Sequence, residues 1–127
     1  MSERTPHPNE SIAQAWLAAF NAYDVDALVA LYSDDATHTS PKIRALHPET
    51  GGLLRGKAQL AQWWRAANAR LPGLRYELTR LTANDARVFV EYLRHSPAEA
   101  PSEAPTPVAE VFDVADGRIV ASRVYHG

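Results

Sequence analysis

The chain contains no cysteine. This absence excludes a disulfide framework, a thiolate metal site and a cysteine nucleophile. An excess of basic residues is also lacking, since the formal net charge is −2, so composition gives no electrostatic case for a nucleic-acid partner. No apolar run approaches membrane-spanning length, and the polar segment from Met1 to Asn9 has no stretch of signal-peptide type. We therefore expect a cytoplasmic protein with no membrane partner.

Patterns for metal and nucleotide sites are lacking as well. The five histidines are scattered, and no two have the i, i+4 spacing that places two metal ligands on one helix face. Residues 51–58 come within one residue of a phosphate-binding loop, but Ala58 stands where a serine or threonine would hold magnesium. We expect no metal and no cofactor.

The composition that is present suits one globular domain. Its 127 residues are 46% hydrophobic and 22% charged, enough for a single core and ordinary for a globular protein. We expect a flexible N-terminal arm over residues 1–8 and a single domain over residues 9–127.

The first half of the chain reads as largely helical. The residues Ile12, Trp16 and Phe20 share one helical face, which predicts a helix over about 9–23. The further elements that we expect are a short helix near 25–32 capped by Asp24, a tight turn at Asp34-Asp35, a strand near 36–40, a loop over 41–55 and a helix over about 57–70.

The second half reads as antiparallel strands. We expect them near 74–83, 86–95, 107–115 and 118–126, with hairpin turns at Asn84-Asp85 and Asp116-Gly117. The proline-rich residues 96–107 are expected to form a mobile, dispensable loop. Helices first and strands after predict an α+β fold.

The stretch from Asp24 to Pro41 carries a family resemblance, supported by Gly56–Trp64 and by Asp116–Ile119. In this order the chain resembles the nuclear transport factor 2-like superfamily, in its SnoaL-like and ketosteroid-isomerase-like branches. The resemblance implies a cone-shaped fold of three N-terminal helices packed on a strongly curved antiparallel sheet. It also implies a deep apolar pocket for a small apolar organic ligand, and a homodimer formed through the convex sheet face.

The resemblance carries over only part of the isomerase chemistry. The oxyanion-hole tyrosine falls on Trp16, the proton-transferring aspartate on Ser40, and the sheet acid near Glu110, so the steroid isomerase mechanism is disfavoured. Serine is no base near neutral pH without its own activator. The Arg-x-Asp strand motif of limonene-epoxide-hydrolase-like members is missing too.

The resemblance also implies which strand residues face the pocket. The inward set is Val88, Val90, Tyr92, Arg94, Val108, Glu110, Phe112, Val114, Ser122, Val124 and His126. The set suited to a dimer interface on the convex face is Phe89, Leu93, Val111, Ile119, Ala121 and Tyr125.

Glu110 is the leading catalytic candidate, because an inward carboxyl in an apolar strand would have a raised pKa and could donate a proton. The alternative is a carboxylate that faces solvent or pairs with an arginine on a neighbouring strand. His38 and Ser40 share a strand face, and either could belong to an acid–base set with Glu110 or His126, or simply form a polar pocket wall. The terminal position of His126 also fits a frayed, exposed residue.

Aromatic and apolar side chains complete the expected site. The candidate ligand-binding residues are Trp16, Phe20, Tyr32, Trp63, Trp64, Val90, Tyr92 and Phe112, although aromatic residues at helical spacing usually pack in a core. Two functions stay open: cofactor-independent acid–base catalysis of isomerase, cyclase or lyase type, and a non-catalytic ligand-binding or dimerisation module.

Overall fold

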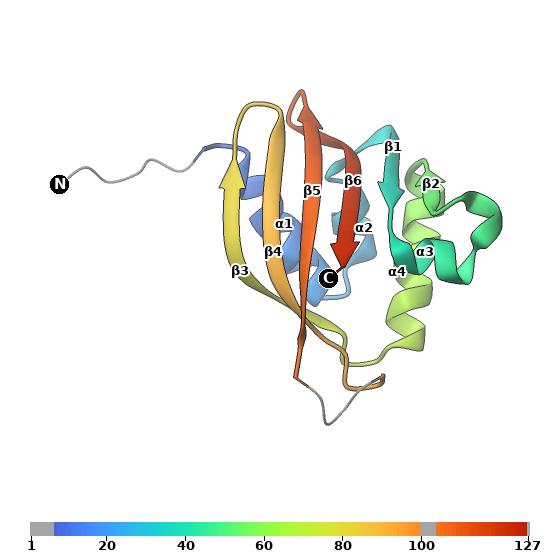
Figure 1. The fold of residues 1–127 in the computed structure, drawn as a ribbon. Coiled ribbons are helices and arrows are strands. Elements are labelled where there is room, and N and C mark those ends of the chain that lie inside the picture. The colour runs from blue at the N-terminus through green and yellow to red at the C-terminus, as the bar shows by residue number, and fades with distance from the viewer. Residues whose placement is uncertain (1–6, 100–103, 127) are drawn as a thin grey trace.

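The computed structural model of the chain, which describes residues 7–99 and 104–126, confirms the α+β fold. Six strands form one curved, open sheet in the order β2-β1-β6-β5-β4-β3 (Figure 1). The strands are β1 Tyr32–Thr39, β2 Leu53–Arg55, β3 Arg75–Ala83, β4 Arg87–His95, β5 Thr106–Ala115 and β6 Arg118–His126.

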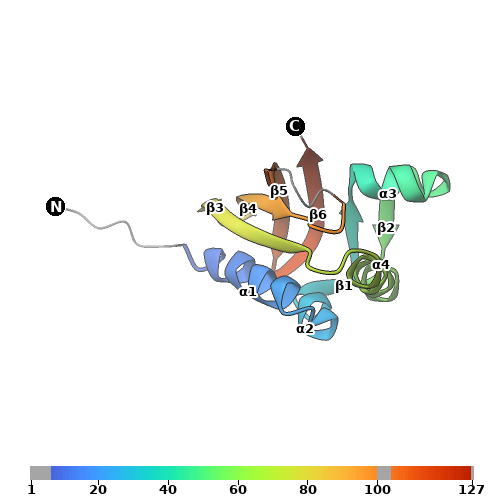
Figure 2. The same ribbon diagram turned by 90° about the horizontal axis from the view of Figure 1, so that it is seen from below.

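Three of the helices lie at the positions that the hydrophobic periodicity predicts. They are α1 Glu10–Asn21, α2 Val25–Val29 and α4 Lys57–Arg70. Helix α1 packs on β3 and β4, while α4 packs on α2 and β1. Figure 2 shows α1 and α2 along one side of the curved sheet, with α4 close to β1. The buried faces of these helices and the concave face of the sheet share one core.

The sequence analysis predicts a wholly antiparallel sheet, and the structure departs from this in one pairing. Strand β1 pairs with β6 in parallel, whereas the other four pairings are antiparallel. A hairpin forces antiparallel neighbours, but β1 and β6 are joined through the whole rest of the domain, so no local turn dictates their direction.

The expected loop over residues 41–55 is largely regular structure. It contains helix α3 Pro41–Leu46, the 3₁₀ turn η1 Pro48–Thr50 and strand β2. Ser40 caps α3 by accepting a hydrogen bond from the Lys42 backbone N–H at 3.1 Å, and Pro41 occupies the first turn. Burial of Ile43 fixes this short helix to the domain.

The acidic pair Asp34-Asp35 does not form the expected turn. Both residues lie within β1, which begins at Tyr32, and the short helix before it ends at Val29 instead of near residue 32. The pairing of β1 with β6 is irregular between Tyr32 and Thr37, so the exposed acidic residues occupy the irregular stretch of the strand.

Alternation along the strands places most of the expected residues on the concave face. Val88, Val90 and Tyr92 of β4 are buried, as are Glu110 and Phe112 of β5. One convex-face prediction is wrong: Ile119 is fully buried. The register shifts between Asp113 and Val114, leaving Val120 as an extra residue in β6, so Ile119 and Ser122 both face inward.

The ends of the predicted mobile segments are held to the domain. Glu99 forms ion pairs with Arg94 and Lys42, and His7 contacts Asp85 at 2.8 Å. The remainder of the predicted arm, residues 1–6, and of the predicted loop, residues 100–103, lies outside the described residues.

Candidate functional site

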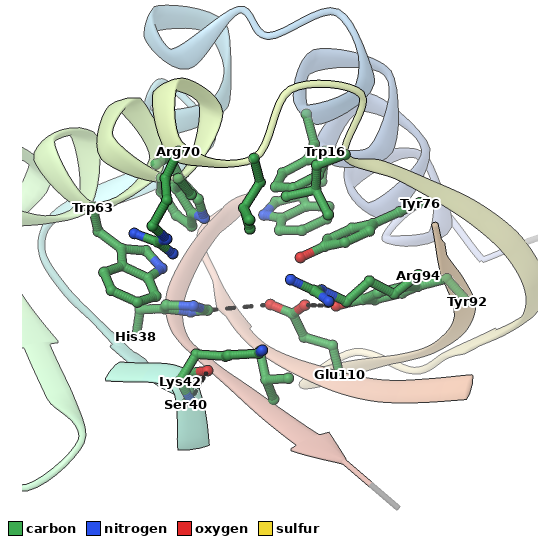
Figure 3. A pocket seen from close by; sticks show the side chains of 16 residues that line it. Trp16, His38, Ser40, Lys42, Trp63, Arg70, Tyr76, Tyr92, Arg94 and Glu110 are labelled. Carbon is green, nitrogen blue, oxygen red and sulfur yellow. Dashed lines mark hydrogen bonds and ion pairs between the residues drawn. The ribbon is translucent and has the colours of Figure 1, made fainter. Parts of the chain in front are cut away.

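A cavity opens between α1, α4 and the concave face of the sheet, with Lys42 of α3 in its lining (Figure 3). Its volume is small, about 50 Å³. The lining residues are Trp16, Phe20, His38, Ser40, Lys42, Trp63, Trp64, Ala67, Arg70, Leu71, Leu74, Tyr76, Tyr92, Arg94, Glu110 and Val124.

Glu110 projects from β5 into this cavity and is 1% exposed. Its Oε1 accepts a hydrogen bond from the Tyr92 hydroxyl at 2.8 Å, and its Oε2 has no hydrogen-bond partner among the described residues. Burial raises the pKa of Glu110 to about 8, against the smaller opposing effect of the Tyr92 hydrogen bond. Near neutral pH the group is therefore mainly a neutral carboxylic acid.

His38 lies on β1 and is 3% exposed, and burial lowers its pKa to about 4. Its Nδ1 is 2.6 Å from the Ser122 Oγ, which is 2.9 Å from the Tyr32 hydroxyl oxygen. The Trp16 indole N–H donates to that tyrosine oxygen at 3.0 Å. A buried chain of four side chains therefore ends at His38.

The Trp16 indole sets the direction of these hydrogen bonds, because an indole N–H can only donate. If the Tyr32 and Ser122 hydroxyl protons both form hydrogen bonds within this set of four side chains, Tyr32 donates to Ser122 and Ser122 donates to His38 Nδ1. That arrangement assigns the imidazole proton to Nε2. His38 is then a neutral ring whose Nδ1 lone pair is already occupied, which suits it better to donate a hydrogen bond than to act as a base.

The His38 Nδ1 and Glu110 Oε2 atoms approach to 4.0 Å, the contact drawn between the two side chains in Figure 3. This distance is too long for a hydrogen bond. Since the pKa of Glu110 is raised and that of His38 lowered, the pair is neutral around pH 6–7 rather than ionic.

Stacked aromatic rings form one wall of the cavity. The Tyr76 ring stacks on Phe20 and on Tyr92, with centroids 3.9 and 4.2 Å apart. Trp16 also stacks on Phe20 and meets Trp64 edge to face. Tyr92 also donates its hydrogen bond to Glu110, and Tyr76 and Arg94 line the same cavity, so the wall extends from Glu110 toward the polar mouth.

The mouth carries three cationic side chains from three different elements: Lys42 of α3, Arg70 of α4 and Arg94 of β4. Arg94 and Lys42 pair with opposite oxygens of Glu99, at 2.7 and 3.3 Å. The Arg70 guanidinium lies 6.0 Å from the centroid of the Trp63 ring. The cavity is therefore aromatic within and cationic at its mouth.

The structure brings most of the sequence-predicted site residues together. Glu110, His38, Ser40 and five of the aromatic candidates line the cavity; the five are Trp16, Phe20, Trp63, Trp64 and Tyr92. Tyr32, Val90 and Phe112 are instead buried in the core. His126 pairs with Val108 through its backbone, and its side chain lies outside the described part of the structure.

Sequence reasoning missed the cationic mouth and the internal hydrogen-bond chain. The sequence analysis assigned Arg94 to the inward face but gave it no role. Lys42 lies on α3, a helix that the sequence analysis did not predict, and Arg70 is the last residue of α4. Ser122 was predicted to face inward, but no role was predicted for it. The signal available for Arg94 was a charged residue in phase with buried Val90 and Tyr92, since charge on an apolar strand face is a functional cue.

No group of three or more histidine, aspartate or glutamate side chains in residues 7–99 and 104–126 is arranged to hold a metal ion. None of the helices described there is both long and apolar enough to cross a membrane.

The comparison with known families identifies the class. The model of the SnoaL-like domain family matches residues 13–122, which is most of the chain. The chain therefore belongs to the SnoaL-like domain family. No curated protein matches the sequence.

Solved structures share the fold. A SnoaL-like protein of unknown function from Burkholderia thailandensis is 29% identical with a TM-score of 0.81, over 94% of this chain and 93% of that one. A protein with a ketosteroid-isomerase-like fold from Catenulispora acidiphila, in complex with trimethylamine, is 22% identical with a TM-score of 0.74 (97% and 88% covered). A putative polyketide cyclase from Sinorhizobium meliloti is 21% identical with a TM-score of 0.74 (91% and 94%).

Proposed function

We propose that the protein binds a small organic molecule in the cavity and moves a proton on it, with Glu110 as the acid–base group. The observation that carries the proposal is the buried Oε2 of Glu110, which faces the cavity without a hydrogen-bond partner among the described residues. A buried polar atom without a partner is costly, and a ligand atom within hydrogen-bond reach would remove that cost.

The chemistry follows from the protonation state of the carboxyl group. A pKa of about 8 keeps Glu110 mainly protonated near neutral pH but close enough to its pKa for the carboxylate to form readily, which suits general acid–base catalysis. The carboxylate takes a proton from a carbon next to a carbonyl group, and the resulting carboxylic acid returns it to a second position. Neutral His38 donates a hydrogen bond to the ligand and is not itself the base.

The relatives are consistent with such a role. One structural relative is described as a putative polyketide cyclase, and another holds a small molecule, trimethylamine. In this chain Glu110 and His38 supply a buried polar pair beside the aromatic wall of the cavity, which a purely structural domain does not need.

Proton exchange in deuterated water tests the proposal. Small ketones such as cyclohexanone are incubated with the protein, and loss of the α-proton signals is followed by NMR. We expect wild type to accelerate the exchange, with a rate that rises with pH through about 8 because the carboxylate is the reactive form. Glu110→Gln should abolish the acceleration.

Glu91→Gln is the matched control, because Glu91 is an exposed carboxylate on β4. The Glu91→Gln variant should accelerate exchange of the ketone α-protons as much as wild type does. If Glu110→Gln keeps full turnover, Glu110 is not the acid–base group. If wild type binds the ketones without any exchange, the protein is a binding module.

We also propose that the protein is a homodimer formed through the convex sheet face. The exposed side chains of Phe89 and Tyr125 and the adjoining Leu93 and Val111 support this assembly.

A further inference from the structure

We propose that the ligand is a small organic carboxylate, whose anionic group lies between Arg94 and Lys42 at the cavity mouth in the place that Glu99 now occupies. This inference rests on the proposed ligand-binding role of the cavity and names the chemical class of the ligand. It was not among the expectations from sequence, which favoured an apolar ligand.

The mouth of the cavity carries an excess of positive charge. Lys42, Arg70 and Arg94 come from three elements, and Figure 3 shows their side chains converging on the region of His38 and Glu110. The chain as a whole has a formal net charge of −2, so this local excess of positive charge runs against its overall sign. A concave site lined by one sign of charge concentrates ligands of the opposite sign.

The interior groups do not neutralise this charge. Near neutral pH His38 is uncharged and Glu110 is mainly protonated. Among the described residues, Glu99 is the carboxylate that reaches Lys42 and Arg94, and Arg70 is in no ion pair. Three cations therefore face one anion at the mouth.

Glu99 shows that the mouth can hold a carboxylate. Arg94 Nη1 lies 2.7 Å from Oε1 of Glu99, and Lys42 Nζ lies 3.3 Å from Oε2, so each oxygen has its own cation. Ser96 donates a further hydrogen bond to Oε1 at 2.7 Å. These contacts hold the pKa of Glu99 at about 2, despite its partial burial.

Glu99 is also the weakest part of this arrangement. Its side chain is 36% exposed, whereas that of Arg94 is 12% exposed and lines the cavity. Water can therefore hydrate a displaced Glu99, while Arg94 would be left partly buried and needs a replacement anion. A ligand carboxylate supplies that anion, and its apolar body then lies along the aromatic wall toward Glu110.

A cationic ligand fits this mouth poorly, because it would face three like charges. Trimethylamine, which one structural relative holds, is therefore a useful negative probe.

Binding can be followed directly, since all three tryptophans of the chain, Trp16, Trp63 and Trp64, line the cavity. We would titrate the wild type with benzoate, with the neutral analogue benzamide, with trimethylamine and with inorganic phosphate, and record tryptophan fluorescence. We expect benzoate to bind about tenfold or more tightly than benzamide, with an affinity that falls as salt is added. Trimethylamine and phosphate should bind far more weakly than benzoate.

Variants of the mouth separate this role from a structural one. Lys42→Gln and Arg94→Gln should each weaken benzoate binding and leave benzamide binding nearly unchanged. Glu99→Gln should strengthen benzoate binding, because the competing carboxylate is gone; misfolding cannot produce such a gain. Arg118→Gln is the matched control, since Arg118 is an exposed arginine at the start of β6.

Equal binding of benzoate and benzamide would overturn the carboxylate assignment while leaving Glu110 chemistry intact, because the exchange assay uses neutral ketones. Phosphate binding as tight as that of benzoate would overturn it as well, since the mouth would then be a general anion site. Unchanged benzoate affinity in both Lys42→Gln and Glu99→Gln would show that the ion pairs only hold the turn at Ser96–Glu99.

Discussion

At the scale of single residues, Glu110 and His38 are two buried titratable groups whose pKa values are displaced in opposite directions. Burial disfavours the charged form of each, so that Glu110 gains protons and His38 loses them relative to the unfolded chain. Both groups therefore couple folding stability to pH.

We predict a specific stability profile from these shifts. Between about pH 4.5 and 6.5 Glu110 is protonated in the native state and ionised in the unfolded chain, whereas His38 is neutral in the native state and protonated in the unfolded chain. The two effects on the free energy of unfolding therefore oppose each other. From pH 6.5 to 8 the unfolded chain loses its remaining His38 proton, and Glu110 dominates the difference between the states. The native state binds more protons there, so stability falls by about 1 kcal/mol as pH rises.

Urea unfolding at a series of pH values, with Glu110→Gln beside wild type, measures this effect. The variant cannot ionise, so the difference in unfolding free energy between the variant and wild type should grow in its favour between pH 6.5 and 8. Glu91→Gln should behave like wild type. Parallel curves for Glu110→Gln and wild type across that interval would mean that Glu110 is not held protonated.

Sequence reasoning reached Glu110 through its apolar strand and the family resemblance, and His38 through the strand face that it shares with Ser40. It could not reach the chain from Trp16 through Tyr32 and Ser122 to His38, because these residues come from three distant segments and meet only in the folded core. Tyr32 was expected to touch a ligand, and its hydroxyl is instead engaged with Trp16 and Ser122.

At the scale of elements, the short helix α2 depends on its N-cap. Asp24 accepts a hydrogen bond from the Ala27 backbone N–H at 3.1 Å, as its position before the helix predicts. With only five residues, α2 has little stability of its own, and its buried Leu28 belongs to the core.

Asp24→Ala is therefore expected to lower the free energy of unfolding by about 1 kcal/mol, the usual cost of losing such a cap. Asp24→Asn keeps an acceptor and should lose much less. Asp35→Ala, at an exposed acidic position in β1, serves as the control for lost charge. Urea denaturation of the three variants measures these differences, and equal losses for Asp24→Ala and Asp35→Ala would contradict the cap.

Some element boundaries can be predicted from nearby residues in the sequence, and others depend on distant parts of the fold. Hairpin signals at Asp116-Gly117 gave the right turn, because both residues need positive φ, and the structure has 53° and 75° there. The segment 41–55 was misjudged because its glycines and prolines also suit a helix start and a 3₁₀ turn. The extra residue at Val120 was invisible, since a bulge depends on the partner strand.

At the scale of the whole molecule, the convex face of the sheet carries apolar side chains that the single chain leaves exposed. Phe89 is 45% and Tyr125 53% exposed, and Leu93 and Val111 lie on the same face. The register sets Phe89 opposite Val111 and Tyr125 opposite Ala109, so these side chains lie on one face of β4, β5 and β6. Exposed apolar side chains gathered on one face in this way favour an interface.

We expect the wild type to sediment as a dimer at micromolar concentration, because pairing two copies through this face removes both patches from water. The double substitution Phe89→Asp with Tyr125→Asp should give a folded monomer, since the new carboxylates would lose hydration without gaining partners at the interface. Leu46→Asp alters an equally exposed apolar residue on α3, away from the sheet face, and should remain dimeric. A monomeric wild type at the same concentration, or a double variant that stays dimeric, would show that this face is not the interface.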